Sequence, residues 1–408
     1  MKVLRAYKTE IDPNNVQRTL LLKHAGTARY AYNWGLIEKK KAFKTKHKIP
    51  NAIELHRRLN ALKPTDFPWM YEVSKCSPQE ALRNLDRAFD NFFRRCKAKK
   101  QGKHKGKTGF PRFKSKKKSI GSFRLTGTIK VYRNSIQLPR LGILSLKETD
   151  YIPQDAKIMS ATISEHAGRW FVSIQVEETI ADPKAKPESI VGIDLGIKTL
   201  ATCSDGTVFE NPKTLRKNMK KIKRLSRSLH RKQKVSKNRK KAARRLAKLH
   251  YRIGNIRKDT IHKITTQLAK TKSVIGIEDL NVSGMMKNHC IAQAISDLGL
   301  YEFRRQLKYK GELYGCKIVL VDRFFPSSKM CSICGCLNNN LELSDRFWTC
   351  DCGAKHDRDM NAAMNIKDYT EKALTLARVK EQAVASSAKA LNAYGEDLPL
   401  VSSQEETK

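Results

Sequence analysis

Three short segments place an acidic residue where an apolar run ends or where a helix begins, and they constrain the fold of this chain more than any other feature. Asp194 and Glu278 each end an apolar run of strand length. Asp359 comes just before a run of small residues that would let a helix lie close against a sheet. A carboxylate in an apolar strand is costly unless it binds something. The pattern therefore predicts a single site, assembled from residues that are far apart in the sequence.

The three acids suit the hydrolysis of a phosphodiester. That reaction needs negative charge to be neutralised at the attacking and leaving oxygens, and two metal ions roughly 4 Å apart can supply this when carboxylates hold them. Mg²⁺ prefers such oxygen ligands. We therefore predict an RNase H-like nuclease core in which Asp194, Glu278 and Asp359 are catalytic and bind two Mg²⁺ ions. Asp279 and Asp357 are competing candidates, although Asp279 would point to the opposite strand face from Glu278.

Four cysteines have the spacing of a zinc ribbon. Cys331 and Cys334 form a C-x-x-C pair, and Cys350 and Cys352 follow as a C-x-C pair, a departure from the usual C-x-x-C. Glycines directly after Cys334 and Cys352 suit tight turns around a metal. Four thiolates would hold Zn²⁺ tetrahedrally and leave no open position, so the predicted zinc is structural rather than catalytic. Cys336 is a spare candidate ligand.

The charge of the chain indicates a nucleic-acid partner. The 408 residues include 82 Lys and Arg against 39 Asp and Glu, a formal net charge of +43. Self-repulsion of this size is tolerated when a polyanion neutralises it. The N-terminus does not read as a signal peptide, and no apolar run approaches the roughly 20 residues that span a bilayer. We expect no membrane partner and a soluble, cytoplasmic protein.

The first 182 residues predict strands on either side of a helical block. A strand at residues 2–9 precedes helices within 13–97, and Ser77 and Glu80 are expected to cap the last of them as a capping box. A basic Gly/Lys loop at 97–118 follows. The alternating pattern that comes next predicts a small β-barrel or sandwich that includes the N-terminal strand.

The remainder predicts a mixed α/β core that carries a basic helical hairpin. Residues 213–258 hold 21 Lys or Arg and no acid, and thin apolar stripes suggest two long helices joined near 235–238. Such a hairpin would lie along phosphates. The candidate contacts to the nucleic-acid backbone, two of them on the earlier helix, are Arg83, Arg87, Lys220, Arg224, Arg231 and Arg244.

These motifs resemble the TnpB (OrfB) family encoded by insertion sequences, which is similar to the nuclease core of type V CRISPR effectors. The similarity covers nearly the whole chain. It is carried by GFPRFK, GIDLGIKTLA, GIEDL, FFPSSKMCSICG and HDRDMNAAMNI. The resemblance implies a RuvC-type core with an inserted zinc ribbon, a wedge domain and a helical recognition domain. The implied domains are 1–12 with 119–182 (β-barrel wedge), 13–118 (recognition), 183–325 with 353–370 (RuvC-like), 326–352 (zinc ribbon) and 371–408 (flexible tail).

The resemblance also implies an RNA-guided endonuclease that cuts double-stranded DNA. A non-coding guide RNA from the transposon end would direct it, and the protein would read a short motif beside the target. Lys75 and Gln79 are candidates for that reading, because Gln pairs with adenine and Lys with guanine. A bacterial or archaeal, nucleoid-associated protein is implied, with a separate transposase encoded by the same element. The alternatives are a transposase using the same acids for strand transfer, or a DNA-binding regulator of transposition.

Overall fold

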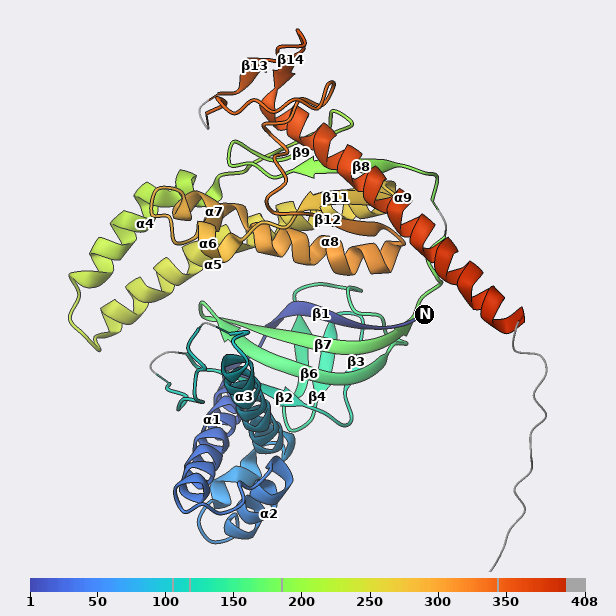
Figure 1. Ribbon diagram of the computed structural model, residues 1–408. Helices are drawn as coiled ribbons and strands as arrows, with labels where there is room; N and C mark the ends of the chain where they lie inside the picture. The colour runs from blue at the N-terminus through green and yellow to red at the C-terminus, as the bar shows by residue number, and fades with distance from the viewer. Residues whose placement is uncertain (105, 117–118, 185, 343–344, 394–408) are drawn as a thin grey trace, which may run out of the picture. The chain divides into compact units, whose positions relative to one another are not determined.

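The chain forms two compact units, Met1–Asp182 and Pro183–Lys408, and each has its own hydrophobic core (Figure 1). The final stretch of the last helix, residues 380–393, is described by its backbone alone. The computed structural model describes residues 1–104, 106–116, 119–184, 186–342 and 345–393.

The first unit contains one strand, a helical block and six further strands. Its first helix begins at an Asn14 cap, which forms a reciprocal capping box with Gln17. The elements are β1 (Lys2–Asp12), α1 (Asn15–Lys44), α2 (Ala52–Leu62), η1 (Pro68–Glu72), α3 (Cys76–Lys100), β2 (Ser122–Leu125), β3 (Lys130–Val131), β4 (Ser135–Leu138), β5 (Gly142–Leu146), β6 (Lys157–His166) and β7 (Arg169–Thr179).

The seven strands of this unit form one antiparallel sheet in the order β2-β6-β7-β1-β5-β4-β3. The N-terminal strand belongs to this sheet, as predicted, and lies in its middle. The predicted closed barrel is wrong, because no pairing joins β2 to β3 within the described residues. The reason lies in the end strands. β3 pairs through only two residues, while β2 packs against α1 and α3, so helices cover that end of the sheet where a barrel would need another strand.

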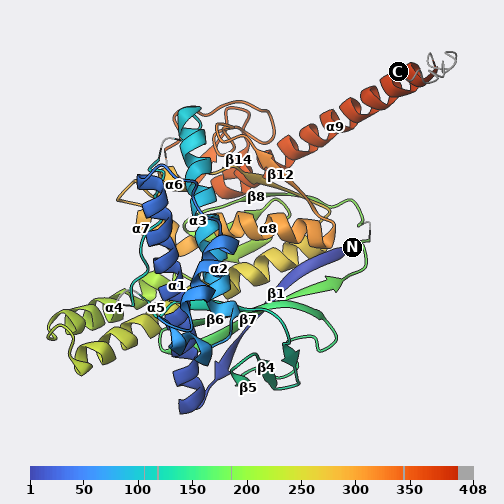
Figure 2. The ribbon, with the colours of Figure 1, turned by 90° about the horizontal axis from the view of Figure 1, so that it is seen from below.

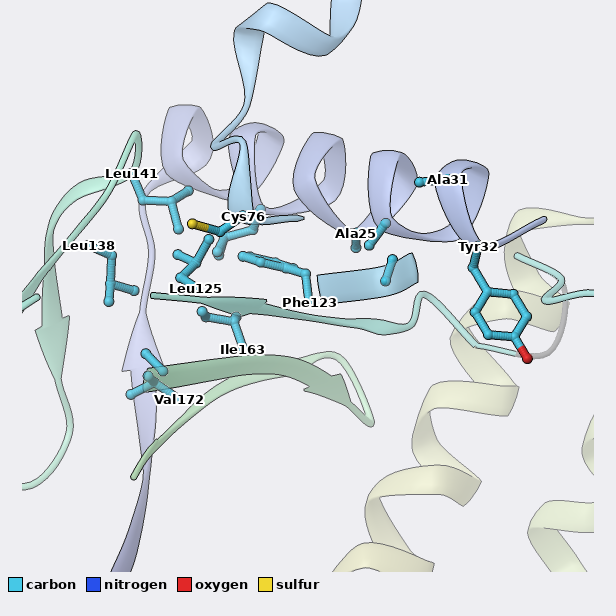
Figure 3. Close-up of a cluster of buried hydrophobic side chains, with 14 of the residues drawn as sticks. Ala25, Ala31, Tyr32, Cys76, Phe123, Leu125, Leu138, Leu141, Ile163 and Val172 are labelled. Carbon is cyan, nitrogen blue, oxygen red and sulfur yellow. The ribbon is translucent and has the colours of Figure 1, made fainter. Parts of the chain in front are cut away.

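One core joins the helices to this sheet, as Figure 3 shows. Phe123 and Leu125 of β2 and Ile163 of β6 are almost fully buried, and they face Ala25 of α1 and Cys76 of α3. The capping box predicted at the start of α3 is wrong. Ser77 is buried, and its hydroxyl donates 2.9 Å to the His24 carbonyl of α1.

The second unit alternates strands with helices and ends in a long helix. Its elements are β8 (Ile190–Asp194), β9 (Thr199–Cys203), β10 (Val208–Glu210), α4 (Thr214–His230), α5 (Lys237–Thr271), β11 (Val274–Glu278), α6 (Val282–Met285), α7 (Ala292–Leu298), α8 (Leu300–Tyr314), β12 (Lys317–Val321), β13 (Phe347–Thr349), β14 (Lys355–Asp357) and α9 (Arg358–Ala393).

The main sheet of this unit is mixed, in the order β10-β9-β8-β11-β12. β8, β11 and β12 run parallel, whereas β9 and β10 pair antiparallel. Successive strand residues point to opposite faces. Val191 and Ile193 therefore join the core formed with α5 and α8, while Gly192 between them faces α9. The sheet thus lies between two helical layers (Figure 1).

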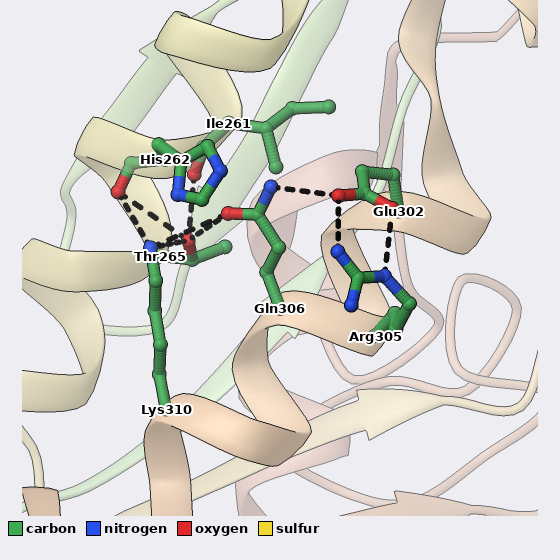
Figure 4. A network of polar contacts seen from close by, with 7 residues as sticks. All are labelled: Ile261, His262, Thr265, Glu302, Arg305, Gln306 and Lys310. Carbon is green, nitrogen blue, oxygen red and sulfur yellow. Dashed lines mark hydrogen bonds and ion pairs between the residues drawn. The ribbon is translucent and has the colours of Figure 1, made fainter. Parts of the chain in front are cut away.

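A buried polar network ties α5 to α8 beneath the sheet, as Figure 4 shows. The Lys310 amine donates 2.7 Å to the Thr265 hydroxyl and 2.8 Å to the His262 carbonyl. Gln306 links this group to Glu302. Burial lowers the pKa of Lys310 to about 8, and the surrounding acceptors satisfy its donors. The network holds α5 and α8 together in the helical layer that packs against the sheet.

The basic segment that follows β10 folds into two helices side by side, α4 and α5, in both views (Figures 1 and 2). The last helix, α9, continues past residue 370 to Ala393 without a break. The rest of the predicted flexible tail, residues 394–408, lies outside the described residues.

Candidate active site and cysteine cluster

Strand register brings Asp194 and Glu278 to the same edge of the sheet. Ile193 of β8 pairs with Ile277 of β11 in parallel register, so the acid that follows each residue lies at the carboxyl end of its strand. Asp194 shares the face of Gly192, two residues earlier, and that face is the one covered by α9.

Two glycines allow α9 to lie directly on this face. Gly192 and Gly276 are partners across β8 and β11. A Cβ atom at Gly192 would lie 2.2 Å from the Ala363 carbonyl oxygen, and one at Gly276 would lie 1.9 Å from the Thr370 hydroxyl. Asp359 is one helical turn before Ala363, on the same side of the helix. The close approach therefore carries Asp359 toward the other two acids.

The three carboxylates influence one another. Burial and the negative charges of Glu278 and Asp359 raise the pKa of Asp194 to about 7, although Arg358 and the Leu195 amide oppose the rise. Each acid is partly buried rather than fully exposed. The structure therefore places Glu278 and Asp359 near enough to Asp194 for their charges to repel it, and a cation would relieve that repulsion.

Basic and hydroxyl groups border these acids. The Ser327 hydroxyl donates to Glu278 Oε1 at 2.5 Å. Arg346 lies 3.3 Å from an Asp359 oxygen, and Arg358 lies 3.7 Å from the same oxygen. Sequence reasoning missed these three residues. Ser327 and Arg358 do lie inside the quoted motifs FFPSSKMCSICG and HDRDMNAAMNI, so the motifs were a signal for them.

The competing acids have other partners. Asp279 forms ion pairs with Arg304 and with Arg323, and its hydrogen bond with Arg323 is the main cause of its lowered pKa. Asp357 accepts hydrogen bonds from the backbone amides of Asp359 and Met360, so it caps the start of α9. Glu278 and Asp359, by contrast, are the acids whose charges raise the pKa of Asp194, which makes them the better candidates for metal ligands.

The four predicted cysteines form one cluster. Their sulfur atoms all lie within 4.8 Å of one another, with Cys331 3.8 Å from Cys352 and Cys334 3.5 Å from Cys350. Tetrahedral zinc with Zn–S bonds of 2.3 Å would separate its sulfurs by about 3.8 Å, so the cluster could hold zinc. The hydrophobic core around it is small, with Leu341 and Trp348 as its main members. A metal is the usual support for so small a fold.

A histidine that the sequence analysis did not consider lies against this cluster. His356 is buried, and its Nε2 atom is 3.1 Å from the Cys331 sulfur. Burial opposes ionisation of that thiol, but backbone amides of Cys334 and Ile333 and the His356 contact lower the pKa of Cys331 to about 6. Cys336 does not join the four-sulfur cluster.

The candidate nucleic-acid contacts of the first unit lie along α3. Lys75 is exposed at the N-cap position, and Gln79 is partly buried one turn later. Arg83 pairs with Glu80 at 2.7 Å, and Arg87 donates to Asn84 at 3.3 Å.

The candidates of the basic hairpin are all exposed. Lys220 and Arg224 lie on α4, Arg231 lies at its C-cap, and Arg244 lies on α5. None of the four forms an ion pair with another described residue of the chain. Their charges therefore remain uncompensated within this part of the protein.

Three family models match parts of the chain. The model described as "Probable transposase" (OrfB, IS605 type) matches residues 171–289, and the "Cas12f1-like, TNB domain" model matches 301–366. A "Helix-turn-helix domain" model matches 1–48. In the structure that last segment consists of β1 and the single long helix α1, so it has no helix-turn-helix geometry.

Relatives extend the similarity over most of the chain. A Streptomyces pristinaespiralis protein with the name "Putative RNA-guided DNA endonuclease" is 38% identical over 90% of this chain and 89% of its own length. The chain belongs to the TnpB (OrfB) family. The Escherichia coli K12 relative InsQ, which carries the same descriptive name, is 33% identical over 90% of this TnpB chain and 92% of its own length.

A solved structure shares the fold of this TnpB protein. The Cas12f1 protein, solved by cryo-electron microscopy as a complex with single-guide RNA and target DNA, aligns with a TM-score of 0.57 at 15% identity. The alignment covers 90% of this chain and 99% of that one. The TnpB chain therefore has the mixed α/β fold of that protein. Among the described residues, no helix has both the length and the apolar composition needed to cross a bilayer.

Proposed function

We propose that this TnpB protein is an RNA-guided, metal-dependent endonuclease that cuts double-stranded DNA. The single observation that carries the catalytic part of the proposal is the approach of Asp359 on α9 to Asp194 and Glu278 at the strand ends, where burial and mutual repulsion raise the pKa of Asp194 to about 7. The names of the relatives support the RNA-guided part. The strand order and the acids at the strand ends support a RuvC-type, RNase H-like core.

The acids are a suitable donor set for Mg²⁺, because they offer carboxylate oxygens at a partly buried, negatively charged site. Bound Mg²⁺ would neutralise charge on the phosphate and activate water. Asp194, Glu278 and Asp359 would hold the ions, while Arg346, half-exposed beside Asp359, is placed to bind a phosphate oxygen. The four cysteines would hold one structural Zn²⁺.

The proposed guide is a non-coding RNA from the transposon end, held through the basic surfaces. The exposed cations within residues 213–258 support this, since that stretch of α4 and α5 contains no Asp or Glu. Lys75 and Gln79 are proposed to read the motif beside the target, since Lys75 is exposed at the N-cap position of α3 and Gln79 is partly exposed one turn later. Base pairing with the guide would read the rest of the target.

Asp194→Ala tests the catalytic proposal. The variant should lose cleavage of guide-matched DNA by at least about a thousandfold, since the metal ligand is gone, while its affinity for the guide RNA stays unchanged. The control is Lys263→Gln on α5, whose side chain pairs with Asp259 rather than with any of the three acids. Strand joining without guide-dependent cutting would favour the alternative function, a transposase. The matched family model is described as "Probable transposase", which supports testing that alternative.

A further inference from the structure

Two buried asparagines on α9 hold a short segment that lies beside the acids. Asn361 and Asn365 are each 2% exposed and lie one helical turn apart. The Asn361 amide donates 2.7 Å to the Met330 carbonyl, and its oxygen accepts from the Ser332 amide at 3.0 Å. The Asn365 amide donates 2.7 Å to the Ser327 carbonyl and 2.6 Å to that of Met330. Four hydrogen bonds thus fix residues 327–332 to the helix.

The held segment delivers a hydroxyl to one of the acids. Ser327 is 5% exposed, and its Oγ donates to Glu278 Oε1 at 2.5 Å. This length is typical of a hydroxyl donating to a carboxylate. Because Oε1 accepts this hydrogen bond, the rotation of the Glu278 carboxylate is restricted. Hydrogen bonds of this kind orient metal-binding carboxylates.

We propose that Ser327 is a positioning residue for the Glu278 carboxylate, held in place by Asn361 and Asn365. The inference rests on the proposed function, because it assigns the device that orients one of the three proposed metal ligands. It also connects that ligand with the helix that carries Asp359. The hydrogen bonds would thereby hold Glu278 of β11 and Asp359 of α9 in a fixed position relative to each other.

The same segment contains Cys331, the first cysteine of the cluster. The carbonyl of Met330 and the amide of Ser332, on either side of that cysteine, are both bound by Asn361. Zinc at the cluster would therefore stiffen the segment that carries Ser327. Residues 327–332 therefore contact both sites, through Cys331 in the cysteine cluster and through Ser327 beside Glu278, although the two sites have no ligand in common.

Ser327→Ala in the zinc-loaded full-length protein is the direct test, with Ser328→Ala as the matched control. Ser328 is the adjacent serine, is partly buried, and forms no hydrogen bond with the three acids among the described residues. Mn²⁺ binding would be measured by electron paramagnetic resonance in the absence of nucleic acid. Ser327→Ala should weaken Mn²⁺ binding about tenfold, the size typical for loss of a group that orients a ligand. Ser328→Ala should bind as wild type does.

Three further measurements separate the possible outcomes. Zinc content and melting temperature should be unchanged in Ser327→Ala, and Ser327→Thr, which keeps the hydroxyl, should recover most of the lost affinity. Asp194→Ala defines the site by abolishing the same Mn²⁺ binding. If Asp194→Ala abolishes binding but Ser327→Ala binds like wild type, the positioning role is overturned while the proposed function stands. If Mn²⁺ binding does not depend on Asp194, the proposed function itself fails.

Discussion

At the scale of single residues, Asp194 carries an electrostatic cost that its protein neighbours do not relieve. Its carboxyl is partly buried at the end of β8, and Glu278 and Asp359 add negative charge. Arg358 offsets this only in part. A carboxylate kept under such repulsion stabilises the fold less than an uncharged side chain would, as is common where a carboxylate serves a functional site, and the proposed cation would offset the repulsion.

This cost predicts how stability depends on pH. The pKa of Asp194 is about 7 in the folded chain and 3.8 when unperturbed, so the folded state binds more protons between these values. Protein without bound Mg²⁺ should therefore lose stability as the pH rises from about 4 to 7. Asp194→Asn should remove this loss and raise stability at pH 8 by roughly 2–4 kcal/mol.

Thermal unfolding of wild type and Asp194→Asn across pH 5 to 8, in Mg²⁺-free buffer with zinc retained, measures this effect. Added Mg²⁺ should raise the melting temperature of wild type and leave that of the variant unchanged. Parallel pH profiles for the two proteins would mean that Asp194 is not the strained group.

At the scale of elements, the contact of α9 with β8 and β11 decides whether the site forms. The contact requires glycine on both strands. Gly276→Ala would place a methyl group against Thr370, and overpacking of this kind costs about 1–3 kcal/mol. We expect lower stability together with reduced cleavage, because α9 carries Asp359.

Gly254→Ala is the matched control, because a Cβ atom there meets no atom within 4 Å and the residue lies inside α5. It should stabilise the protein by about 0.5–1 kcal/mol, the helix preference of alanine over glycine. Chemical unfolding of both variants gives the comparison. Equal effects of the two substitutions would contradict the account of α9 packing.

The paired basic helices make a separate prediction. Lys220→Gln with Arg224→Gln removes two exposed cations from α4, so RNA affinity should fall and its dependence on salt should weaken. The slope of log K against log[salt] should decrease in magnitude by about 1.5, which is the loss of two phosphate contacts. Lys263→Gln on α5, whose cation already pairs with Asp259, should change the slope little. An unchanged slope in the double variant would place the RNA elsewhere.

Local patterns made some of these elements predictable. The apolar runs before Asp194 and Glu278 mark strands because burial on both faces leaves few polar positions. The cysteine spacing likewise predicted a cluster that the fold then assembles. The asparagine contacts were not predictable, since Asn361 binds partners about 30 residues away whose position depends on tertiary packing. The capping box predicted at Ser77 was wrong for the same reason, because its hydroxyl donates a hydrogen bond to α1 instead of capping its own helix.

At the scale of the whole molecule, a net charge of +43 requires an explanation beyond the fold. A bound RNA would neutralise much of it, and RNA also distinguishes a guided nuclease from a transposase with the same acids. Whether the sheet of the first unit closes into a barrel could not be predicted from the sequence. The pairing of strands as short as β3 depends on which helices cover the ends of the sheet.

The most direct test of RNA-guided cleavage is to co-express the gene with its downstream flanking DNA, sequence the RNA that co-purifies, and challenge the complex with DNA matching the RNA's end. We predict one discrete RNA that extends beyond the transposon end. We also predict cutting that follows the guide when its sequence is changed and disappears in Asp194→Ala. Heterogeneous cellular RNA with folded protein, or cutting that ignores a changed guide, would contradict the account.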